Sequence, residues 1–199
     1  MENARKMYDE WEVPINLYKS RNHVEIEWRL GRTGKQFDTN VGKETFEKIL
    51  RGLQKYKGWE EVREKTFTVF YGPKGSNKRV TYDEVTDEQE SIIKKRIVVA
   101  DYKLDDKPFD VRLAINTEEP CEWDENADAS DSKSKKRWSF IRKNLSIDMS
   151  IVKGDPADKD ADEDTVYQVE FEIVDPSKVQ TRDELFNLLY KTWDLMKLI

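Results

Sequence analysis

The sequence predicts a mainly β, α+β fold, in which an antiparallel β-sheet or barrel is flanked by a few helices. Two observations lead to this prediction. About nine segments have strand character, several with apolar and polar residues in strict alternation, as residues 22–31 (NHVEIEWRLG) do. Most of these segments follow one another through short turns, with one helix between them, which favours antiparallel pairing.

The expected strands follow the alternation and the turn signals between them. In chain order they are residues 22–31, 35–41, 65–71, 78–83, 91–104, 109–118, two strands within 133–152, and 165–174. The sequence GPKGSN separates the third from the fourth strand, and a tight turn near Lys143–Asn144 divides the 133–152 segment. Such short connections join neighbours in a sheet.

Three helices are expected beside the strands. Residues 4–20 are predicted to form a short helix that ends near Pro14, and residues 44–57 have helical spacing of apolar positions. Residues 181–198 predict an amphipathic helix in which Thr181 and Glu184 form a capping box. Its apolar stripe, expected to pack on the sheet, consists of Leu185, Leu188, Leu189, Trp193 and Met196.

The 199 residues fit one domain of ordinary size. We expect an N-terminal helix or arm over residues 1–20, a barrel over 22–175 and a C-terminal helix over 181–198. No apolar run is long enough for a membrane-spanning helix, so no membrane association is predicted.

The composition excludes several kinds of chemistry. The chain has one cysteine, Cys121, and one histidine, His23. Disulfide frameworks, zinc fingers and Ser-His-Asp or Cys-His catalytic triads are therefore excluded. Any catalysis must depend on carboxylates, lysines and arginines.

The net charge of −6 is unevenly distributed. Residues 118–131 contain seven acidic and no basic residues, and residues 153–164 contain six acidic and two basic ones. These segments together carry −11, so the remaining residues carry about +5. We expect two solvated acidic loops on a mildly basic body. Calcium binding by Asp158, Asp160 and Asp162 is a weaker alternative, because the glycine and terminal glutamate of an EF-hand are missing.

The charged side chains on the polar faces of the strands are sorted by strand. The first strand carries Glu25, Glu27 and Arg29, and the last carries Gln168, Glu170 and Glu172. Four middle strands carry basic residues, which are in chain order Arg79, then Lys94 and Arg96, then Arg112, then Lys133, Lys135 and Arg137. The strand after them carries Asp148 and Ser150. Residues two apart on a strand point the same way, so each set converges on one surface.

Closure of the sheet would place the first and last strands side by side and bring four glutamates together. Carboxylates at that distance repel one another and raise one another's pKa values. A divalent cation resolves this conflict, and oxygen ligands without histidine or cysteine favour Mg²⁺ or Mn²⁺. The facing bases would then hold a polyphosphate, which is the arrangement that phosphoryl transfer requires. The alternative interpretation is a set of solvated faces with cross-strand ion pairs.

Six segments resemble the metal-dependent RNA 5′-triphosphatases of mRNA capping, in the triphosphate tunnel metalloenzyme superfamily of fungi, protozoa and large DNA viruses. They are VEIEWRLG, RVTYD, DVRLAINTEEP, KSKKRWSF, LSIDMSIVK and VYQVEFEIV, which together span most of residues 22–174. A single ExExR motif is weak, but two glutamate strands in order with KxKxRxSF and SIDMS between them are specific. The resemblance implies an eight-stranded antiparallel β-barrel that forms a tunnel.

The resemblance also implies roles for individual residues. Glu25, Glu27 and Glu172 would bind the metal, Mg²⁺ or Mn²⁺, and Glu170 would orient the attacking water or the metal's water shell. Arg79, Lys135 and Arg137 would hold phosphates, supported by Lys94, Arg96, Arg112 and Lys133. Asp148 would position a basic residue or water, and Arg29, Glu118, Ser139 and Ser150 would support the site.

The implied activity is metal-dependent removal of the γ-phosphate from triphosphate-ended RNA, the first step of capping, with NTP hydrolysis as a side activity. One alternative is a tripolyphosphatase or small organic triphosphatase of the same superfamily, and another is a non-catalytic barrel that binds polyphosphate or RNA ends. Expected partners are the RNA 5′ end, NTP and a separate capping guanylyltransferase, with no DNA.

An intracellular location is expected, in the nucleus or cytoplasm, and the small size indicates a viral or minimal form. Sequence-specific RNA recognition is not predicted, because no strand set carries several exposed aromatics.

Overall fold

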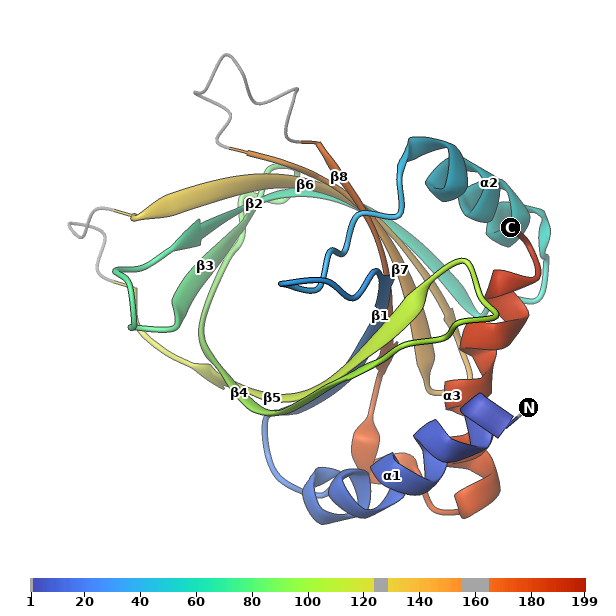
Figure 1. Ribbon diagram of the computed structural model, residues 1–199. Helices are drawn as coiled ribbons and strands as arrows, with labels where there is room; N and C mark the ends of the chain where they lie inside the picture. The colour runs from blue at the N-terminus through green and yellow to red at the C-terminus, as the bar shows by residue number, and fades with distance from the viewer. Residues whose placement is uncertain (1, 124–128, 155–164) are drawn as a thin grey trace.

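The computed structural model describes residues 2–123, 129–154 and 165–199. Within them, eight strands form a closed antiparallel barrel in the order β1-β5-β4-β3-β2-β6-β7-β8 (Figure 1). The strands are β1 (Val24–Gly31), β2 (Glu61–Tyr71), β3 (Lys78–Asp83), β4 (Gln89–Tyr102), β5 (Asp110–Pro120), β6 (Asp131–Arg142), β7 (Leu145–Lys153) and β8 (Val166–Ile173). The predicted fold class, a mainly β barrel with flanking helices, is confirmed.

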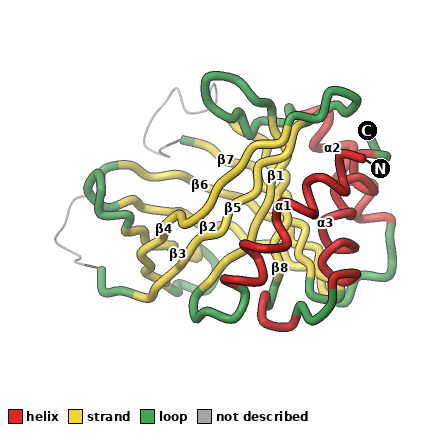
Figure 2. Tube along the Cα trace, turned by 60° about the horizontal axis from the view of Figure 1, so that its bottom comes forward, coloured by secondary structure: helices red, strands yellow, loops and turns green. Residues whose placement is uncertain are grey.

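The hydrophobic core lies outside the barrel, between its wall and three helices. These are α1 (Glu2–Tyr18), α2 (Lys43–Lys55) and α3 (Arg182–Met196), which gather on one side of the molecule (Figures 1 and 2). The outward-facing residues Ile26, Trp28 and Leu30 of β1 are fully buried in this core. Because the apolar side chains pack outside, the positions that alternate with them face the barrel interior and are free to be polar.

Trp28 joins the barrel to the C-terminal helix. Its ring stacks on Phe171 of β8 with centroids 5.4 Å apart, and its indole N–H donates to the Thr192 hydroxyl of α3 over 2.7 Å. Both Trp28 and Thr192 are fully buried. The predicted capping box of α3 is present: the Glu184 backbone N–H donates to the Thr181 hydroxyl, and the Thr181 N–H donates to the Glu184 carboxylate.

Two predicted elements are wrong. The helix expected to end near Pro14 continues to Tyr18, with Pro14 inside it. Proline costs this helix a backbone hydrogen bond, but Met7, Trp11 and Ile15 keep its apolar face packed in the core.

The second predicted strand, residues 35–41, is a loop with an isolated bridge between Arg32 and Asp38. The side chains of Asp38 and Asn40 accept hydrogen bonds from the backbone N–H groups of Asn40 and Gly42, which turns the chain instead of extending it. The barrel therefore has the eight strands that the resemblance implies, one fewer than the nine strand-like segments of the sequence. The predicted turn at Lys143–Asn144 is present, with both residues at positive φ.

The acidic stretches fall largely at the gaps in the described chain. Residues 124–128 and 155–164 are not described, and the possible calcium ligands Asp158, Asp160 and Asp162 lie among them. No helix within the described part of the chain has the length and apolarity that crossing a membrane requires.

We predict that Trp28→Ala lowers the free energy of unfolding by about 3–5 kcal/mol, because it leaves a cavity and removes the bond to Thr192. Urea unfolding followed by circular dichroism measures the change. Val85→Ala is the control, since Val85 is 81% exposed and its truncation should cost less than about 0.5 kcal/mol. Equal costs for the two variants would contradict the assignment of Trp28 to the core.

Candidate active site

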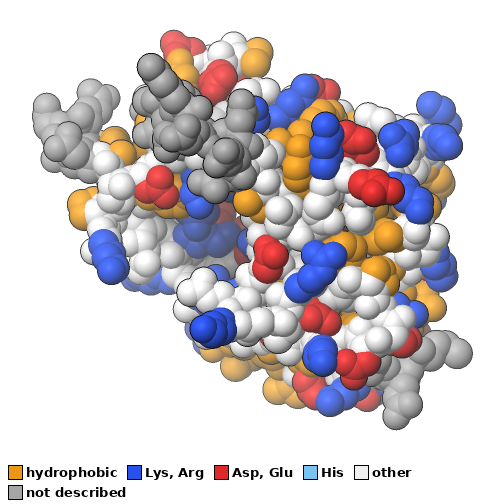
Figure 3. All heavy atoms as spheres, turned by 45° about the horizontal axis from the view of Figure 1, so that its top comes forward, with side chains coloured by type: hydrophobic (Ala, Val, Ile, Leu, Met, Phe, Trp, Pro, Cys, Tyr) orange, Lys and Arg blue, Asp and Glu red, His pale blue; other side chains and the backbone are white. Residues whose placement is uncertain are grey.

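The barrel encloses a cavity of about 1230 Å³ that is lined mainly by charged and polar side chains. The space-filling view shows a hollow in the surface with Lys and Arg side chains inside it (Figure 3). Fourteen of the residues proposed from sequence line this cavity: Glu25, Glu27, Arg29, Arg79, Lys94, Arg96, Glu118, Lys133, Lys135, Arg137, Ser139, Asp148, Glu170 and Glu172. The alternating pattern of the strands therefore converges on one interior space and not on a solvated outer face.

Direct pairing of the first and last strands brings the acidic residues together. β1 pairs with β8 in a short antiparallel register, in which Glu27 lies opposite Glu172 and Arg29 lies opposite Glu170. Glu25 lies on the same face of β1, two residues from Glu27. Four glutamates thus share one wall of the cavity.

Two basic side chains pair with three of these glutamates, Glu25, Glu27 and Glu170. The Lys94 ammonium pairs with Glu25, lies 2.9 Å from a carboxylate oxygen of Glu118 and lies 3.8 Å from one of Glu27. On the other side, the Arg29 guanidinium donates to Glu27 and Glu170, each over 2.7 Å. The ammonium of Lys94 and the guanidinium of Arg29 therefore already lie among the carboxylates of this wall.

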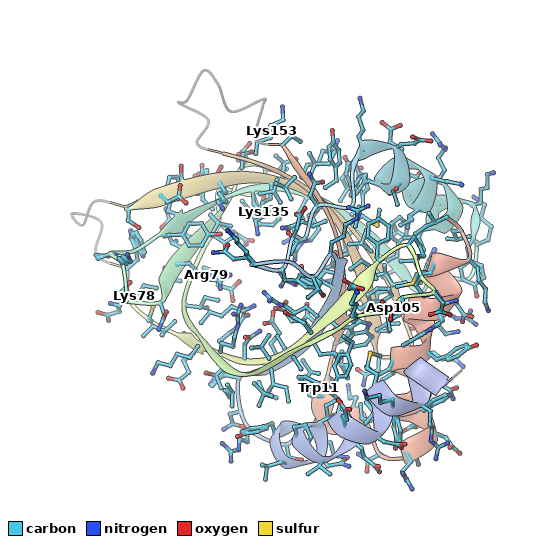
Figure 4. The ribbon with its side chains drawn as sticks, in the orientation of Figure 1. Trp11, Lys78, Arg79, Asp105, Lys135 and Lys153 are labelled. Atoms are coloured by element: carbon cyan, nitrogen blue, oxygen red, sulfur yellow. The ribbon has the colours of Figure 1, made fainter. Side chains whose placement is uncertain are left out.

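The remaining wall carries bases that lack acidic partners. Lys135 of β6 and Arg79 of β3 point into the barrel interior (Figure 4). Neither forms an ion pair within the described residues, and the same holds for Arg96 and Lys133, which also line the cavity. A group of bases without counterions in an enclosed space is an anion site.

Arg137 is held in place by residues of the neighbouring strand. Its guanidinium lies 3.1 Å from the Asp148 carboxylate and donates to the Ser150 hydroxyl over 3.1 Å. Asp148 is almost fully buried and also accepts a hydrogen bond of 2.6 Å from Ser146. Asp148 therefore forms an ion pair with Arg137 and is itself held by Ser146.

Comparisons with known proteins agree with this geometry. A family model described as mRNA capping enzyme, beta chain, matches residues 61–187, from the start of β2 into α3. The chain belongs to this family, the RNA 5′-triphosphatases of mRNA capping. The resemblance drawn from the six sequence segments is thereby confirmed at the level of the family and its hydrolase activity.

The fold of this RNA 5′-triphosphatase is shared with solved structures of low sequence identity. The S. pombe Pct1 RNA triphosphatase superposes with a TM-score of 0.78 at 14% identity, covering 100% of this chain and 94% of that chain. The Mimivirus capping enzyme triphosphatase superposes with a TM-score of 0.71 at 15% identity, covering 96% and 97%. No curated protein matches the chain in sequence. Packing and topology, more than residue identity, are therefore what these proteins have in common.

Two proposed site residues do not line the cavity. The Arg112 guanidinium forms two hydrogen bonds with Asp101, of 2.6 and 2.8 Å, and lies over the Phe37 ring. Its charge is already satisfied, so the structure gives no support to the phosphate role proposed for it. Ser150 is buried behind Arg137 and acts on that side chain and not on the cavity.

Sequence reasoning did not identify two polar residues that organise the carboxylates. The Asn116 amide donates to Glu25 over 2.9 Å and to Glu27 over 3.2 Å. Asn116 lies two residues before Glu118 on β5, so its side chain points to the same side, into the lumen. Because the side chain is uncharged, the sorting of acids and bases did not point to it. Ser146, the donor to Asp148, was missed for the same reason.

Burial and crowding perturb the titration of the carboxylates. Burial, together with the charges of Glu170 and Glu25, raises the pKa of Glu27 well above its usual value. Burial and the neighbouring Glu25 and Asp148 raise the pKa of Glu172 to about 8. Burial acts to raise the pKa of Glu170, but the Arg29 guanidinium, the hydrogen bond with Glu27 and the charges of Arg137 and Lys94 together outweigh burial and hold that pKa well below its usual range. Glu170 therefore stays ionised while two of its neighbours favour the neutral form.

The bases respond to their surroundings in opposite ways. Burial and the nearby Arg137 lower the pKa of Lys135 to about 8. Burial also disfavours the charge on Lys94, but Glu27 and Glu25 outweigh it and keep the pKa of Lys94 above its usual value. A phosphate beside Lys135 would restore its full charge.

The donor set fits a hard divalent cation. Glu25, Glu27, Glu170 and Glu172 offer oxygen ligands only, and the ammonium of Lys94 already lies among Glu25, Glu27 and Glu118, where it occupies the place of a cation. In this conformation the described residues contain no group of three acidic, His or Cys side chains arranged as metal ligands. The chemistry of the wall suits a metal, and Lys94 would have to move from the glutamates for one to bind.

We predict that the metal-free protein loses stability as the pH rises from about 5 to about 7.5. In this range the folded state keeps a proton on Glu172, whose pKa is about 8, that the unfolded state, with an ordinary pKa of 4.5, has released. The raised pKa of Glu27 acts in the same direction. The free energy of unfolding must then fall with pH. Urea unfolding in EDTA at several pH values measures this slope.

Glu172→Gln should make the slope shallower, because the amide cannot titrate. Glu119→Gln is the matched control, since Glu119 is an exposed residue of β5 and its substitution should leave the slope unchanged. A Glu172→Gln slope equal to that of the unsubstituted protein would show that Glu172 is ionised throughout the range.

Proposed function

We propose that this RNA 5′-triphosphatase removes the γ-phosphate with the aid of a divalent cation, Mg²⁺ or Mn²⁺, held by Glu25, Glu27 and Glu172. The observation that carries the proposal is the β1–β8 pairing, which gathers four glutamates opposite unpaired bases inside one cavity. The crowding that raises the pKa of Glu27 and Glu172 favours a bound cation, because a cation stabilises the ionised carboxylates. When bound, the ion would neutralise charge on the phosphate chain.

The phosphate chain is proposed to bind along the basic wall. Arg79, Lys135 and Arg137 would contact the phosphoryl oxygens, and Asp148 keeps the Arg137 guanidinium directed at the lumen. Lys94, Arg96 and Lys133 would support the chain from neighbouring positions. Arg112 is left out of this set, because Asp101 already neutralises it.

Water attack on the γ-phosphorus would complete the reaction. The new bond joins the water oxygen to phosphorus as the bond from phosphorus to the β,γ-bridging oxygen breaks, which releases inorganic phosphate and diphosphate-ended RNA. Glu170 is ionised and accepts hydrogen bonds, so it suits orientation of the water more than complete removal of its proton. In a loose phosphoryl-transfer transition state, positioning and charge stabilisation account for most of the rate. No covalent intermediate is needed.

The proposed substrate is the triphosphate end of RNA, with hydrolysis of NTP as a side activity. A tripolyphosphatase or small organic triphosphatase would use the same cavity, and a non-catalytic polyphosphate-binding barrel would show binding without turnover. The diphosphate-ended product is what a separate capping guanylyltransferase would accept. Such a role in capping would place the protein in the nucleus or cytoplasm.

We predict that Glu27→Ala lowers kcat about 100- to 1000-fold, the effect of losing one charge-stabilising group worth about 3–4 kcal/mol. The same loss is expected for Glu172→Ala. Phosphate release from triphosphate-ended RNA measures it, and circular dichroism confirms folding. The control is Glu119→Ala, which removes an exposed carboxylate of β5 and should retain full activity. Activity of Glu27→Ala at the unsubstituted rate would refute the site.

We predict that γ-phosphate release stops in excess EDTA and returns with Mg²⁺ or Mn²⁺. Competition between triphosphate-ended RNA and tripolyphosphate then separates the substrate hypotheses. Preference for RNA supports the capping substrate, and preference for tripolyphosphate supports the alternative enzyme. Binding of either ligand without phosphate release in any metal would support the non-catalytic barrel.

A further inference from the structure

The charges inside the barrel change along its length in one direction. In a barrel of antiparallel strands, the end of β1 lies at the same rim as the starts of β3, β5, β6 and β8 and the ends of β2, β4 and β7. On four strands, the side chains that line the cavity lose negative charge toward this rim. The changes are from Glu27 to Arg29 on β1, from Glu170 to Gln168 on β8, from Glu90 to Arg96 on β4, and from Asp83 to Arg79 on β3. We call this end the basic rim.

The opposite end of the cavity is acidic. Its lining includes Glu61, Asp83, Glu88 and Glu90, with Arg63 paired to Glu61 and Lys65 paired to Asp83. A polyanion is attracted to the basic rim and repelled from the acidic end. An RNA end therefore enters at the basic rim, and its first nucleoside stays there while the phosphates reach the glutamates.

One aromatic side chain at the basic rim, Tyr71, takes no part in the metal and phosphate sites proposed above. Tyr71 is the last residue of β2, lines the cavity and is partly exposed. The other aromatic residue lining the cavity in the described chain is Phe67, whose ring lies 5.6 Å from the guanidinium carbon of Arg137. The Tyr71 ring, in contrast, has no aromatic, cationic or hydrogen-bonding partner among the described residues. Its free face borders the path of the RNA.

The position of Tyr71 along β2 suits a base and not a phosphate. Phe67 lies opposite Lys135 on β6, beside the proposed phosphate site. Tyr71 is four residues further on, about 13 Å along the strand. A triphosphate and a ribose separate the γ-phosphorus from the first base, so a base reaches the rim when the γ-phosphate is beside Lys135. Arg79 of β3 is the direct cross-strand neighbour of Tyr71 and also lines the cavity, so it lies beside the end of the phosphate chain that is nearest the base.

We propose that Tyr71 is a stacking platform for the first nucleobase of the RNA substrate. The inference rests on the proposed function for the position of the phosphates, and it explains how one cavity can favour a nucleotide end over inorganic tripolyphosphate. Stacking on an aromatic ring is tolerant of base identity, so it gives preference for RNA ends without sequence specificity. The absence of several aligned aromatics on the strands is consistent with recognition of a single base.

The test compares substrates with and without a base. Tyr71→Ala should lower the ratio of kcat/KM for triphosphate-ended RNA to kcat/KM for tripolyphosphate by about tenfold, and Tyr71→Phe should restore it. Tyr82→Ala is the matched control, since Tyr82 is on β3 but does not line the cavity. An unchanged ratio in Tyr71→Ala would overturn the proposal, because both substrates would then depend equally on Tyr71.

A binding measurement separates this proposal from the proposed function. Fluorescence anisotropy of labelled triphosphate-ended RNA in EDTA reports binding without turnover, and Tyr71→Ala should weaken it about tenfold while Tyr82→Ala does not. If the protein bound RNA through Tyr71 but released no phosphate in Mg²⁺ or Mn²⁺, the hydrolytic proposal would fail and the base platform would stand. If the protein released phosphate but Tyr71→Ala bound RNA as tightly as the unsubstituted protein, the base platform would be refuted and the hydrolytic proposal would stand.

Discussion

Repulsion among buried carboxylates is the constraint on which the rest of the structure depends. Glu27 and Glu172 are cross-strand neighbours at the seam that closes the barrel, with Glu25 and Glu170 beside them. Like charges directly opposite each other destabilise an antiparallel pair. The seam is stable because Arg29 and Lys94 bring positive charge to it, and because two of the carboxyls can hold protons. Such a seam lowers stability, and it is the wall at which we propose that a divalent cation binds.

The position of the hydrophobic core makes this seam possible. Helices α1, α2 and α3 cover the outside of the wall, so the same strands that carry glutamates inward bury Ile26, Trp28 and Phe171 outward. Burial of apolar side chains on the outer side stabilises the fold and offsets the cost of burying charged groups in the interior. The polar lumen is therefore a consequence of where the apolar half of each alternating strand is buried.

Much of the candidate site could be predicted from the sequence, since alternation determines which side chains share a face of a strand. That rule places Glu25 with Glu27, and Lys133 with Lys135 and Arg137. The same rule gives Arg112 the correct parity, but it could not show that Asp101 of β4 neutralises this side chain. It also passed over Asn116 and Tyr71, because their roles depend on neighbours that are distant in sequence. Pro14 shows the same limit for helices, where core packing outweighed a local signal.

The sequence by itself determined the strand period, the sorting of acids and bases among strands, and the absence of histidine and cysteine chemistry. These are local properties, because successive side chains of a strand alternate in direction whatever the strand packs against. The tertiary structure decided which strands are neighbours, which charges are already paired, and which rim of the cavity is basic. Those depend on closure between β1 and β8, a contact between opposite ends of the chain that no local pattern specifies.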